Sequence, residues 1–265
     1  LEFRRVLFRS DTLEQLADIP AVYGTAGARS KVVGLADLPG NRFVYALFDA
    51  GEIWVVDLKN PRQPQINKYT NIGKQPYDGL ATQDGHYFMA GLFGEDGIAL
   101  LDLWNESAGV KRILANYGKG EEKLPVYKMP HLRGWSVAGG NAFLPAIGRH
   151  EVLVADTSTW QEAARIPVYG QPVFVMAEPT HRRVWVNFAF PHNDTVQIID
   201  VPSRKVTNLV LVGKRPWNVS LDKAEARLWV VNGLSDDVTV VDVAGAKALK
   251  SIPVGRVPYG VVVVE

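Results

Sequence analysis

The chain of 265 residues contains no cysteine. This absence excludes disulfide bonds, thiolate metal sites and a cysteine nucleophile, and it is compatible with any cellular compartment. No stretch approaches about 18 uninterrupted apolar residues, so the sequence predicts no transmembrane helix. Neither charge is in excess, because 29 basic and 28 acidic residues give a formal net charge of +1. The composition therefore provides no electrostatic case for nucleic acid or an anionic membrane as a partner.

Common catalytic signatures are also missing. The sequence has no glycine-rich dinucleotide or phosphate loop, no His-Glu-x-x-His and no nucleophile elbow. Helical periodicity is scarce, and residues 13–18 are the one short helix candidate. Because 47% of the residues are hydrophobic, the chain nevertheless has the composition of a globular protein.

A repeated turn is the main positive signal. The sequence Gly213-Lys214-Arg215-Pro216-Trp217 recurs in reduced form at Pro76, Pro172 and Pro258, and a divergent copy surrounds Pro130. These prolines, at positions 76, 130, 172, 216 and 258, are separated by 54, 42, 44 and 42 residues. A period close to 42–45 residues indicates a structural repeat.

Each repeat reads as four short strands. The clearest copy predicts strands at 216–221, 227–232, 238–242 and 248–254. The apolar third strand recurs, and second strands precede it at 42–47, 87–92, 142–146 and 183–188. Every copy of the third strand ends in an aspartate, at residues 57, 102, 156, 200 and 242. An aspartate repeated at this place predicts turn formation rather than catalysis. The fold class predicted is therefore all-β, a β-propeller of four-stranded antiparallel blades.

The two ends of the sequence fit this repeat poorly. Residues 1–10 match none of it, so we expect a non-native leader followed by a propeller domain over 11–265. The inner strand expected from Pro258 lacks the rest of its blade, and residues 11–28 are too short to supply it. We therefore expect about five blades of a truncated chain whose N-terminal blades are missing.

The first strand of a propeller blade lies innermost, so the residues after each repeated proline should meet at one mouth of the central channel. These residues are Tyr77, Asp78, His131, Arg133, Val173, Phe174, Trp217, Asn218 and Tyr259. Aromatic rings, an imidazole and a guanidinium suit a large flat ligand that carries carboxylates. Two alternatives stay open: the aromatic residues could be packing residues of the repeat, and Asp78 could cap a backbone amide instead of acting as a base. His86 and His181 are expected in exposed turns.

Two segments carry a family resemblance. Residues 72–79 with the following His86-Tyr87-Phe88-Met89 resemble an inner strand and hairpin of the eight-bladed haem d1 domain of dissimilatory nitrite reductase. Pro130-His131-Leu132-Arg133-Gly134-Trp135 is similar to the segment of the next blade, where that family places a distal histidine over haem d1. The resemblance covers about residues 11–265 and implies an eight-bladed propeller in full.

The resemblance also implies roles for individual residues. His131 matches the distal histidine of the family. The position of the family's second distal histidine falls at or beside Tyr77 and Asp78, so this histidine is lost. Its loss puts nitrite reduction in doubt. We therefore expect His131 and Asp78 as catalytic candidates, and no metal ligand is assigned because the proximal iron ligand belongs to an upstream blade. Residues expected to contact the cofactor are Tyr77, His131, Arg133, Arg29, Trp217 and Tyr259, with Arg29 opening the first inner strand. No Cys-x-x-Cys-His is present for a c-type haem.

The implied function is binding of haem d1 or a late tetrapyrrole precursor in the central pocket, for modification or for delivery to dissimilatory nitrite reductase. The implied partners are this tetrapyrrole, other proteins of haem d1 biosynthesis and the reductase, and the implied compartment is the periplasm. Two alternatives remain. One is a haem d1 dehydrogenase or reductase that has lost an electron-transfer domain, and the other is a non-enzymatic propeller that binds proteins.

Overall fold

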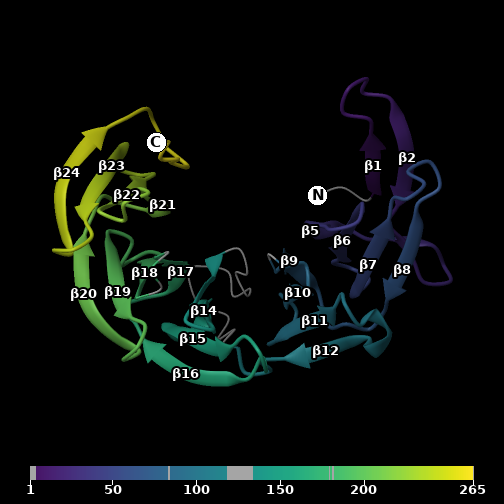
Figure 1. The fold of residues 1–265 in the computed structure, drawn as a ribbon, viewed down its shortest axis with the longest axis horizontal. Helices are drawn as coiled ribbons and strands as arrows, with labels where there is room; N and C mark the ends of the chain where they lie inside the picture. The colour runs from purple at the N-terminus through teal and green to yellow at the C-terminus, as the bar shows by residue number, and fades with distance from the viewer. Residues whose placement is uncertain (1–3, 83, 118–133, 179, 181, 265) are drawn as a thin grey trace. The chain divides into compact units, whose positions relative to one another are not determined.

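The computed structural model describes residues 4–82, 84–117, 134–178, 180 and 182–264, which form strands, turns and short 3-10 helices (Figure 1). The chain divides into two compact units, Leu1–Tyr117 and Gly118–Glu265. Each unit is described here by itself.

The first unit contains two four-stranded antiparallel sheets and two hairpins. The first sheet consists of β5 (Val32–Leu38), β6 (Arg42–Leu47), β7 (Glu52–Asp57) and β8 (Gln65–Tyr69). The second sheet consists of β9 (Pro76–Ala81), β10 (Tyr87–Leu92), β11 (Ile98–Asp102) and β12 (Val110–Ile113), with the 3-10 helix η1 (Glu106–Ala108) before β12. The hairpins are β1 (Arg4–Phe8) with β2 (Gln15–Pro20), and β3 (Val22–Tyr23) with β4 (Ala28–Arg29).

The second unit contains three more four-stranded sheets, and in each of them consecutive strands pair antiparallel. The first consists of β13 (Ser136–Ala138), β14 (Asn141–Ala146), β15 (Glu151–Asp156) and β16 (Glu162–Pro167), with η3 (Ile147–Arg149) before β15. The second consists of β17 (Pro172–Ala177), β18 (Arg183–Phe188), β19 (Thr195–Asp200) and β20 (Lys205–Leu211). The third consists of β21 (Pro216–Leu221), β22 (Arg227–Asn232), β23 (Asp237–Asp242) and β24 (Lys247–Pro253).

The predicted four-stranded repeat is confirmed. Across the described parts of the chain the structure has five such sheets, and three first strands begin at the repeated prolines Pro76, Pro172 and Pro216. The second strands β6, β10 and β18 have the bounds predicted for them. Local alternation and turn residues were therefore sufficient to locate most strands.

Two local predictions were wrong. Residues 13–18 do not form a helix, because Gln15–Pro20 is a strand whose backbone pairs with β1 and whose Ile19 is buried against Tyr45 and Trp54. The inner strand expected from Pro258 is absent, since residues 254–264 have no antiparallel neighbour among the described residues. Within residues 1–10, which were expected as a leader, Arg4–Phe8 form β1.

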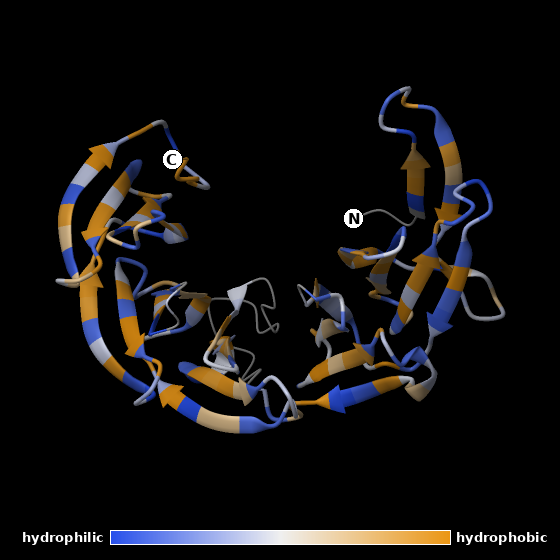
Figure 2. Cartoon of the chain, viewed as in Figure 1, coloured by the Kyte–Doolittle hydropathy of each residue, from blue (hydrophilic) through white to orange (hydrophobic). Residues whose placement is uncertain are grey.

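The core of each unit lies between adjacent sheets. The second and third strands are buried on both faces, so their residues are apolar at nearly every position, as the orange strands of Figure 2 show. In the first unit, Val44 and Val55 pack with Phe88 and Ala99 of the next sheet. Equivalent clusters join the three sheets of the second unit in succession. A single sheet would leave one of these faces in water, so the sheets are stable as a stack.

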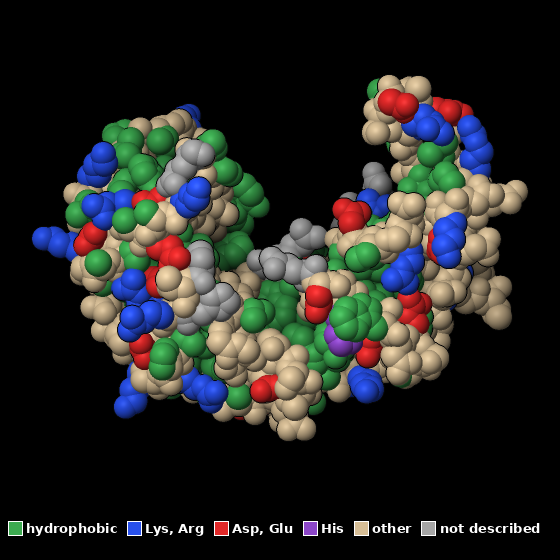
Figure 3. Space-filling view, viewed as in Figure 1, with side chains coloured by type: hydrophobic (Ala, Val, Ile, Leu, Met, Phe, Trp, Pro, Cys, Tyr) green, Lys and Arg blue, Asp and Glu red, His purple; other side chains and the backbone are tan. Residues whose placement is uncertain are grey.

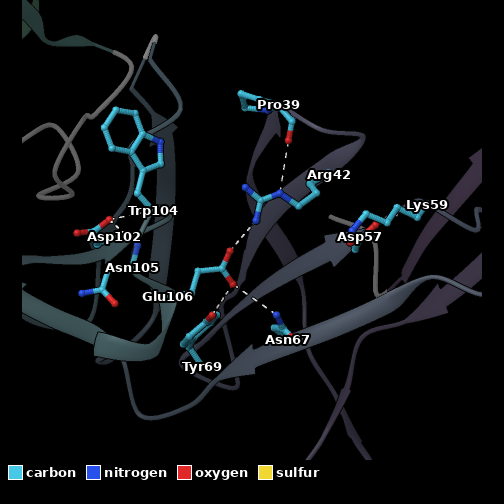
Figure 4. Close-up of polar contacts among 10 residues, drawn as sticks. All are labelled: Pro39, Arg42, Asp57, Lys59, Asn67, Tyr69, Asp102, Trp104, Asn105 and Glu106. Atoms are coloured by element: carbon cyan, nitrogen blue, oxygen red, sulfur yellow. Dashed lines mark hydrogen bonds and ion pairs between the residues drawn. The ribbon is translucent and has the colours of Figure 1, made fainter.

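A polar cluster links the two sheets of the first unit. Glu106 of η1 accepts a hydrogen bond from Arg42 of β6 at 2.6 Å and another from the Tyr69 hydroxyl of β8 at 2.7 Å (Figure 4). Asn67 donates a longer bond of 3.4 Å to the same carboxylate. Burial and the neighbouring Glu106 carboxylate raise the pKa of Tyr69, so its hydroxyl stays a donor. Glu106 therefore fixes the second sheet against the first.

The repeated aspartates are turn formers, as predicted. The Asp156 carboxylate accepts hydrogen bonds from the backbone of Ser158 and of Thr159, each at 2.9 Å. Asp102 binds the backbone N–H groups of Trp104 and Asn105 in the same way, and the other copies also accept a bond from a nearby backbone N–H. Each aspartate thus lies at the end of its strand and accepts hydrogen bonds from backbone N–H groups of the turn that follows.

Replacing Glu106 by alanine should destabilise the first unit by about 1–3 kcal/mol, because Arg42 and Tyr69 lose a partly buried anionic partner. Lys59→Ala is the matched control, since it removes an ion pair with Asp57 whose lysine is 84% exposed. The control should change stability by less than about 1 kcal/mol. Urea denaturation of both variants measures the difference, and equal losses would contradict the role assigned to Glu106.

The stability contributed by the Asp156 charge should depend on pH. Hydrogen bonds from the Ser158 side chain and from the backbone of Thr159 and Ser158 lower the pKa of Asp156 to about 2. An unfolded aspartate titrates near pH ~3.9, so this contribution is complete above that pH and is lost as the pH falls toward 2. The difference in melting temperature between the protein and its Asp156→Asn variant should therefore shrink over this window. A difference that does not change with pH would refute the prediction.

Candidate functional site

Three aromatic side chains that follow the repeated prolines meet in the second unit. The Trp217 ring of β21 lies 6.1 Å from the Phe174 ring of β17 and 5.6 Å from the Tyr259 ring, measured between centroids. The Arg215 guanidinium lies 5.0 Å from the Trp217 centroid. Tyr259 is 74% exposed, so this aromatic row, Phe174, Trp217 and Tyr259, is open to solvent. For these three residues the structure shows the convergence that the repeat predicted.

Three of the repeated proline turns share a backbone conformation. The residue before the proline is left-handed at Gln75, Arg215 and Val257, with φ of 51°, 60° and 50°. Within two of the sheets, the loop between the second and third strands holds this residue, because Phe93 N–H donates to Gln75 O at 2.8 Å and Gly233 N–H donates to Arg215 O at 2.9 Å. This conformation is costly for non-glycine residues, so the surrounding contacts must maintain it.

A β-bulge then follows the proline in β9, β17 and β21. In β17, the buried Asn187 of β18 fills the gap in the ladder, because its side-chain oxygen accepts the Phe174 N–H at 2.8 Å. Its side-chain nitrogen donates to Pro216 O of the next sheet at 2.7 Å. Asn187 therefore fixes two adjacent inner strands, a role that the local sequence does not reveal. Bulges re-aim side chains in this way beside binding sites.

Tyr77 and Asp78 lie in β9 of the first unit. Tyr77 is 36% exposed, and its ring centroid lies 6.1 Å from those of Phe48 and Phe93. One Asp78 side-chain oxygen accepts the Gly79 N–H at 3.1 Å, which is the backbone capping that sequence analysis left open. Burial raises the pKa of Tyr117, and the Asp78 carboxylate adds to the effect. Tyr117 thus stays protonated near a candidate base, and no local motif had indicated it.

Four expected positions need separate mention. Arg29 does not open the first inner strand: it is exposed in β4, opposite Val22, and the inner strand β5 begins at Val32. The first sheet lacks the repeated proline, and the buried Ser30 takes over its turn by accepting the Asp49 N–H at 2.9 Å. His131 and Arg133 lie outside the described residues, as does His181.

His86 is not a solvent-exposed turn residue, contrary to the sequence-based prediction. Its ring is stacked between Tyr87 at 3.8 Å and Trp104 at 4.0 Å, and Nε2 lies 3.3 Å from an Asp102 oxygen. These partners come from two neighbouring strands and the turn after them. The histidine is therefore part of a local aromatic stack, away from the residues that follow the prolines.

The backbones of two inner strands touch in the first unit. A Cβ atom on Gly79 of β9 would lie 2.5 Å from Gly34 O of β5 and 2.9 Å from the Phe88 ring. Gly34 itself has a φ of 59°, a conformation that glycine adopts without strain. This close approach sets the position of Tyr77 and Asp78, the two residues before Gly79.

On the face shown in Figure 3, Lys and Arg side chains lie among Asp and Glu side chains. The described residues hold no group of three or more His, Asp or Glu side chains arranged for a metal ion. No helix in this part of the chain has the length and hydropathy that crossing a bilayer would require.

These sheets and inner strands define a β-propeller protein whose innermost strands present aromatic side chains. The sequence model of the Cytochrome D1 heme domain matches residues 4–264, and the chain belongs to this family. The resemblance inferred from the sequence is therefore confirmed, and the match includes residues 4–10.

The chain is also similar to two curated proteins, both named Protein NirF. It is 47% identical to the protein of Pseudomonas aeruginosa over 256 residues and 48% identical to that of Stutzerimonas stutzeri over 248 residues. These matches cover 96% and 93% of the chain, but the chain spans only 65% and 63% of the length of these relatives.

A solved structure shares the fold. Dihydro-heme d1 dehydrogenase NirN, in complex with DHE, matches with a TM-score of 0.76 at 20% identity, covering 97% of this chain and 54% of that protein. The likeness supports the propeller fold and, at this identity, the fold alone.

Gly79→Ala should destabilise the first unit by about 1–3 kcal/mol, because the added methyl group meets backbone that cannot move aside easily. Gly260→Ala is the control, since a Cβ atom there has no neighbour within 4 Å. The control should unfold at nearly the same urea concentration as the unchanged protein. Equal midpoints for both variants would show that the inner strands do not need this glycine.

Proposed function

We propose that the protein binds haem d1 or a late tetrapyrrole precursor at its inner strands, as part of haem d1 biosynthesis. The observation that carries the proposal is the solvent-accessible aromatic row of Phe174, Trp217 and Tyr259, with Arg215 over Trp217. The family match and the similarity to two proteins named NirF support the same ligand.

The residues present fit such a group. A flat macrocycle gains from contact with aromatic faces, and Trp217 and Tyr259 offer these faces at an exposed edge. Arginine suits the carboxylates of a tetrapyrrole because its fork pairs with them in two hydrogen bonds. We assign this part to Arg215, which lies over the Trp217 ring, and the family resemblance supports Arg133 for the same part. When bound, haem d1 supplies the redox-active iron and the conjugated ring.

The chain's own residues then bind, orient and exchange protons with the ligand. We assign His131 to the face of the macrocycle, where an imidazole can ligate iron or transfer a proton. Asp78 is the second proton-transfer candidate, with the protonated Tyr117 beside it. The bound tetrapyrrole is then either modified by the protein or delivered to dissimilatory nitrite reductase. The proposed partners are other proteins of haem d1 biosynthesis, and the proposed compartment is the periplasm.

A spectroscopic titration of haem d1 into the full-length protein tests the proposal. We expect a one-to-one complex whose absorption bands shift, and His131→Ala should change or weaken these bands. Trp217→Ala should weaken binding by about tenfold through the lost aromatic contact. Trp104→Ala is the matched control, because that indole is 68% exposed but stacks on His86, outside the aromatic row.

Failure of the folded protein to bind haem d1 would overturn the proposal and favour a propeller that binds proteins instead. Binding that tolerates His131→Ala but not Trp217→Ala would retain the tetrapyrrole and remove His131 from the site. An equal loss in the Trp104→Ala control would show that the aromatic row has no particular part in binding.

A further inference from the structure

An exposed aromatic stack lies at one end of the second sheet of the first unit. The Trp104 indole, in the turn after β11, is 68% exposed, and one of its faces lies against the His86 ring at a centroid distance of 4.0 Å. His86 in turn stacks on Tyr87 at 3.8 Å. Figure 4 shows the indole beside Asp102 and directed away from Glu106. These three rings, Trp104, His86 and Tyr87, form a histidine stack that holds the other face of the indole in solvent.

The repeat does not require a tryptophan in this turn. Trp104 is the second residue after the aspartate that ends the third strand, and the residues at the same place in the other four sheets are Lys59, Ser158, Pro202 and Ala244. The turn therefore forms without an aromatic side chain. Because most of its surface stays in water, the indole also contributes little burial to the fold. An exposed tryptophan held in one orientation is typical of residues that anchor protein–protein contacts.

The aspartate beside the stack lacks the cross-strand arginine of its counterparts. In three of the other four sheets an arginine lies opposite the aspartate that ends the third strand, in the pairs Arg42 with Asp57, Arg183 with Asp200 and Arg227 with Asp242. The last of these pairs forms an ion pair of 2.6 Å. In the second sheet of the first unit, the residue opposite Asp102 is Tyr87, and a phenol brings no positive charge.

Two carboxylates put negative charge at the stack. Asp102 accepts the Trp104 N–H at 2.9 Å, and Asp84 accepts the His86 backbone N–H at 3.0 Å. Burial raises the pKa of Tyr87, and both carboxylates add to this effect, so each lies close to the stack. His86 Nε2 lies 3.3 Å from an Asp102 oxygen, but neither carboxylate pairs with a lysine or arginine within the described residues. A cation from a partner would meet this charge without displacing another lysine or arginine.

We propose that the histidine stack and its two carboxylates form a docking site for an arginine-bearing segment of a partner protein. The guanidinium lies over the open face of Trp104 and pairs with Asp102, where it takes the place of the arginine found opposite this aspartate in three other sheets. Arginine suits the site better than lysine because its planar group both stacks on an indole and pairs with a carboxylate. The second unit contains such a stack, since the Arg215 guanidinium lies 5.0 Å from the Trp217 centroid.

The docking site and the proline turn lie at opposite ends of the same sheet. Tyr87 begins β10, whereas Phe93 follows the end of β10 and donates its N–H to Gln75 O, next to Pro76. A strand of six residues spans about 20 Å. A segment held at the histidine stack therefore leaves the turn before Pro76 uncovered. Docking here does not require a tetrapyrrole, so this proposal and the proposed function can fail separately.

Titration of short peptides into the isotope-labelled full-length protein, followed by NMR, tests the site. The probes are acetyl-Gly-Arg-Gly-Arg-Gly-amide and two counterparts in which each arginine is replaced by lysine or by citrulline, a neutral residue of similar shape. The arginine peptide should shift the backbone N–H signals of residues 84–86 and 103–105. It should bind about three- to fivefold more tightly than the citrulline peptide, and added salt should reduce this preference. A pH of about 8 keeps a free imidazole neutral.

Two variants separate the aromatic and the charged part. Trp104→Ala should weaken binding of the arginine peptide about three- to fivefold, because the guanidinium loses the indole face. Asp102→Asn should weaken it by a similar factor, although the amide oxygen can still accept the backbone N–H of the turn. Asp57→Asn is the matched control, since it removes the same charge from the equivalent turn of the first sheet, where Lys59 replaces the tryptophan. The control should leave the affinity unchanged.

Equal binding of the arginine and citrulline peptides, or full affinity in Trp104→Ala, would overturn the docking site. An equal loss in Asp57→Asn, or a lysine peptide that binds as tightly as the arginine peptide, would reduce the effect to net charge and also overturn it. Signals of the histidine stack that shift with protein concentration alone would assign this surface to a second copy of the chain instead.

Discussion

Burial of both faces of the second and third strands is the constraint on which the other features of each unit depend. These strands are apolar at nearly every position and pack against a neighbouring sheet of the same unit, as Val44 does with Phe88 in the first unit and Val196 with Val230 in the second. Hydrophobic burial of about 25 cal/mol per Å² stabilises such a stack, whereas one sheet alone would leave a face in water. Polar links such as Glu106 then set the spacing of neighbouring sheets.

Because the second and third strands supply the core, the innermost strands do not have to be apolar at every position. β9, β17 and β21 are buried at only some of their positions, and each has a bulge after its proline. The left-handed residues before the prolines cost on the order of 1–3 kcal/mol each, and hydrogen bonds from the neighbouring loops hold them. Strain is thus concentrated at the turn that directs the candidate site, and the core tolerates it.

The sequence predicted features that depend on neighbours along the chain. Strand alternation and the aspartate turns are local, so the four-stranded sheets and the role of Asp156 could be read from the residues. Features that depend on tertiary contacts could not. Arg29 was misplaced because Ser30 replaces the proline turn through a contact with Asp49, 19 residues away. His86 looked exposed because nothing in the sequence shows that Trp104 folds over it.

The two residues before the repeated prolines show how blades can diverge without cost to the fold. The same turn carries Lys74-Gln75 in the first unit and Lys214-Arg215 in the second, and all four side chains are exposed, so packing does not restrict them. In the second unit the left-handed position holds Arg215, whose guanidinium lies over the Trp217 ring. In the first unit that position is the neutral Gln75, and the positive charge comes from the exposed Lys74. The same turn therefore presents a different cation in each unit, so the residues before an inner strand can change while the buried strands stay the same.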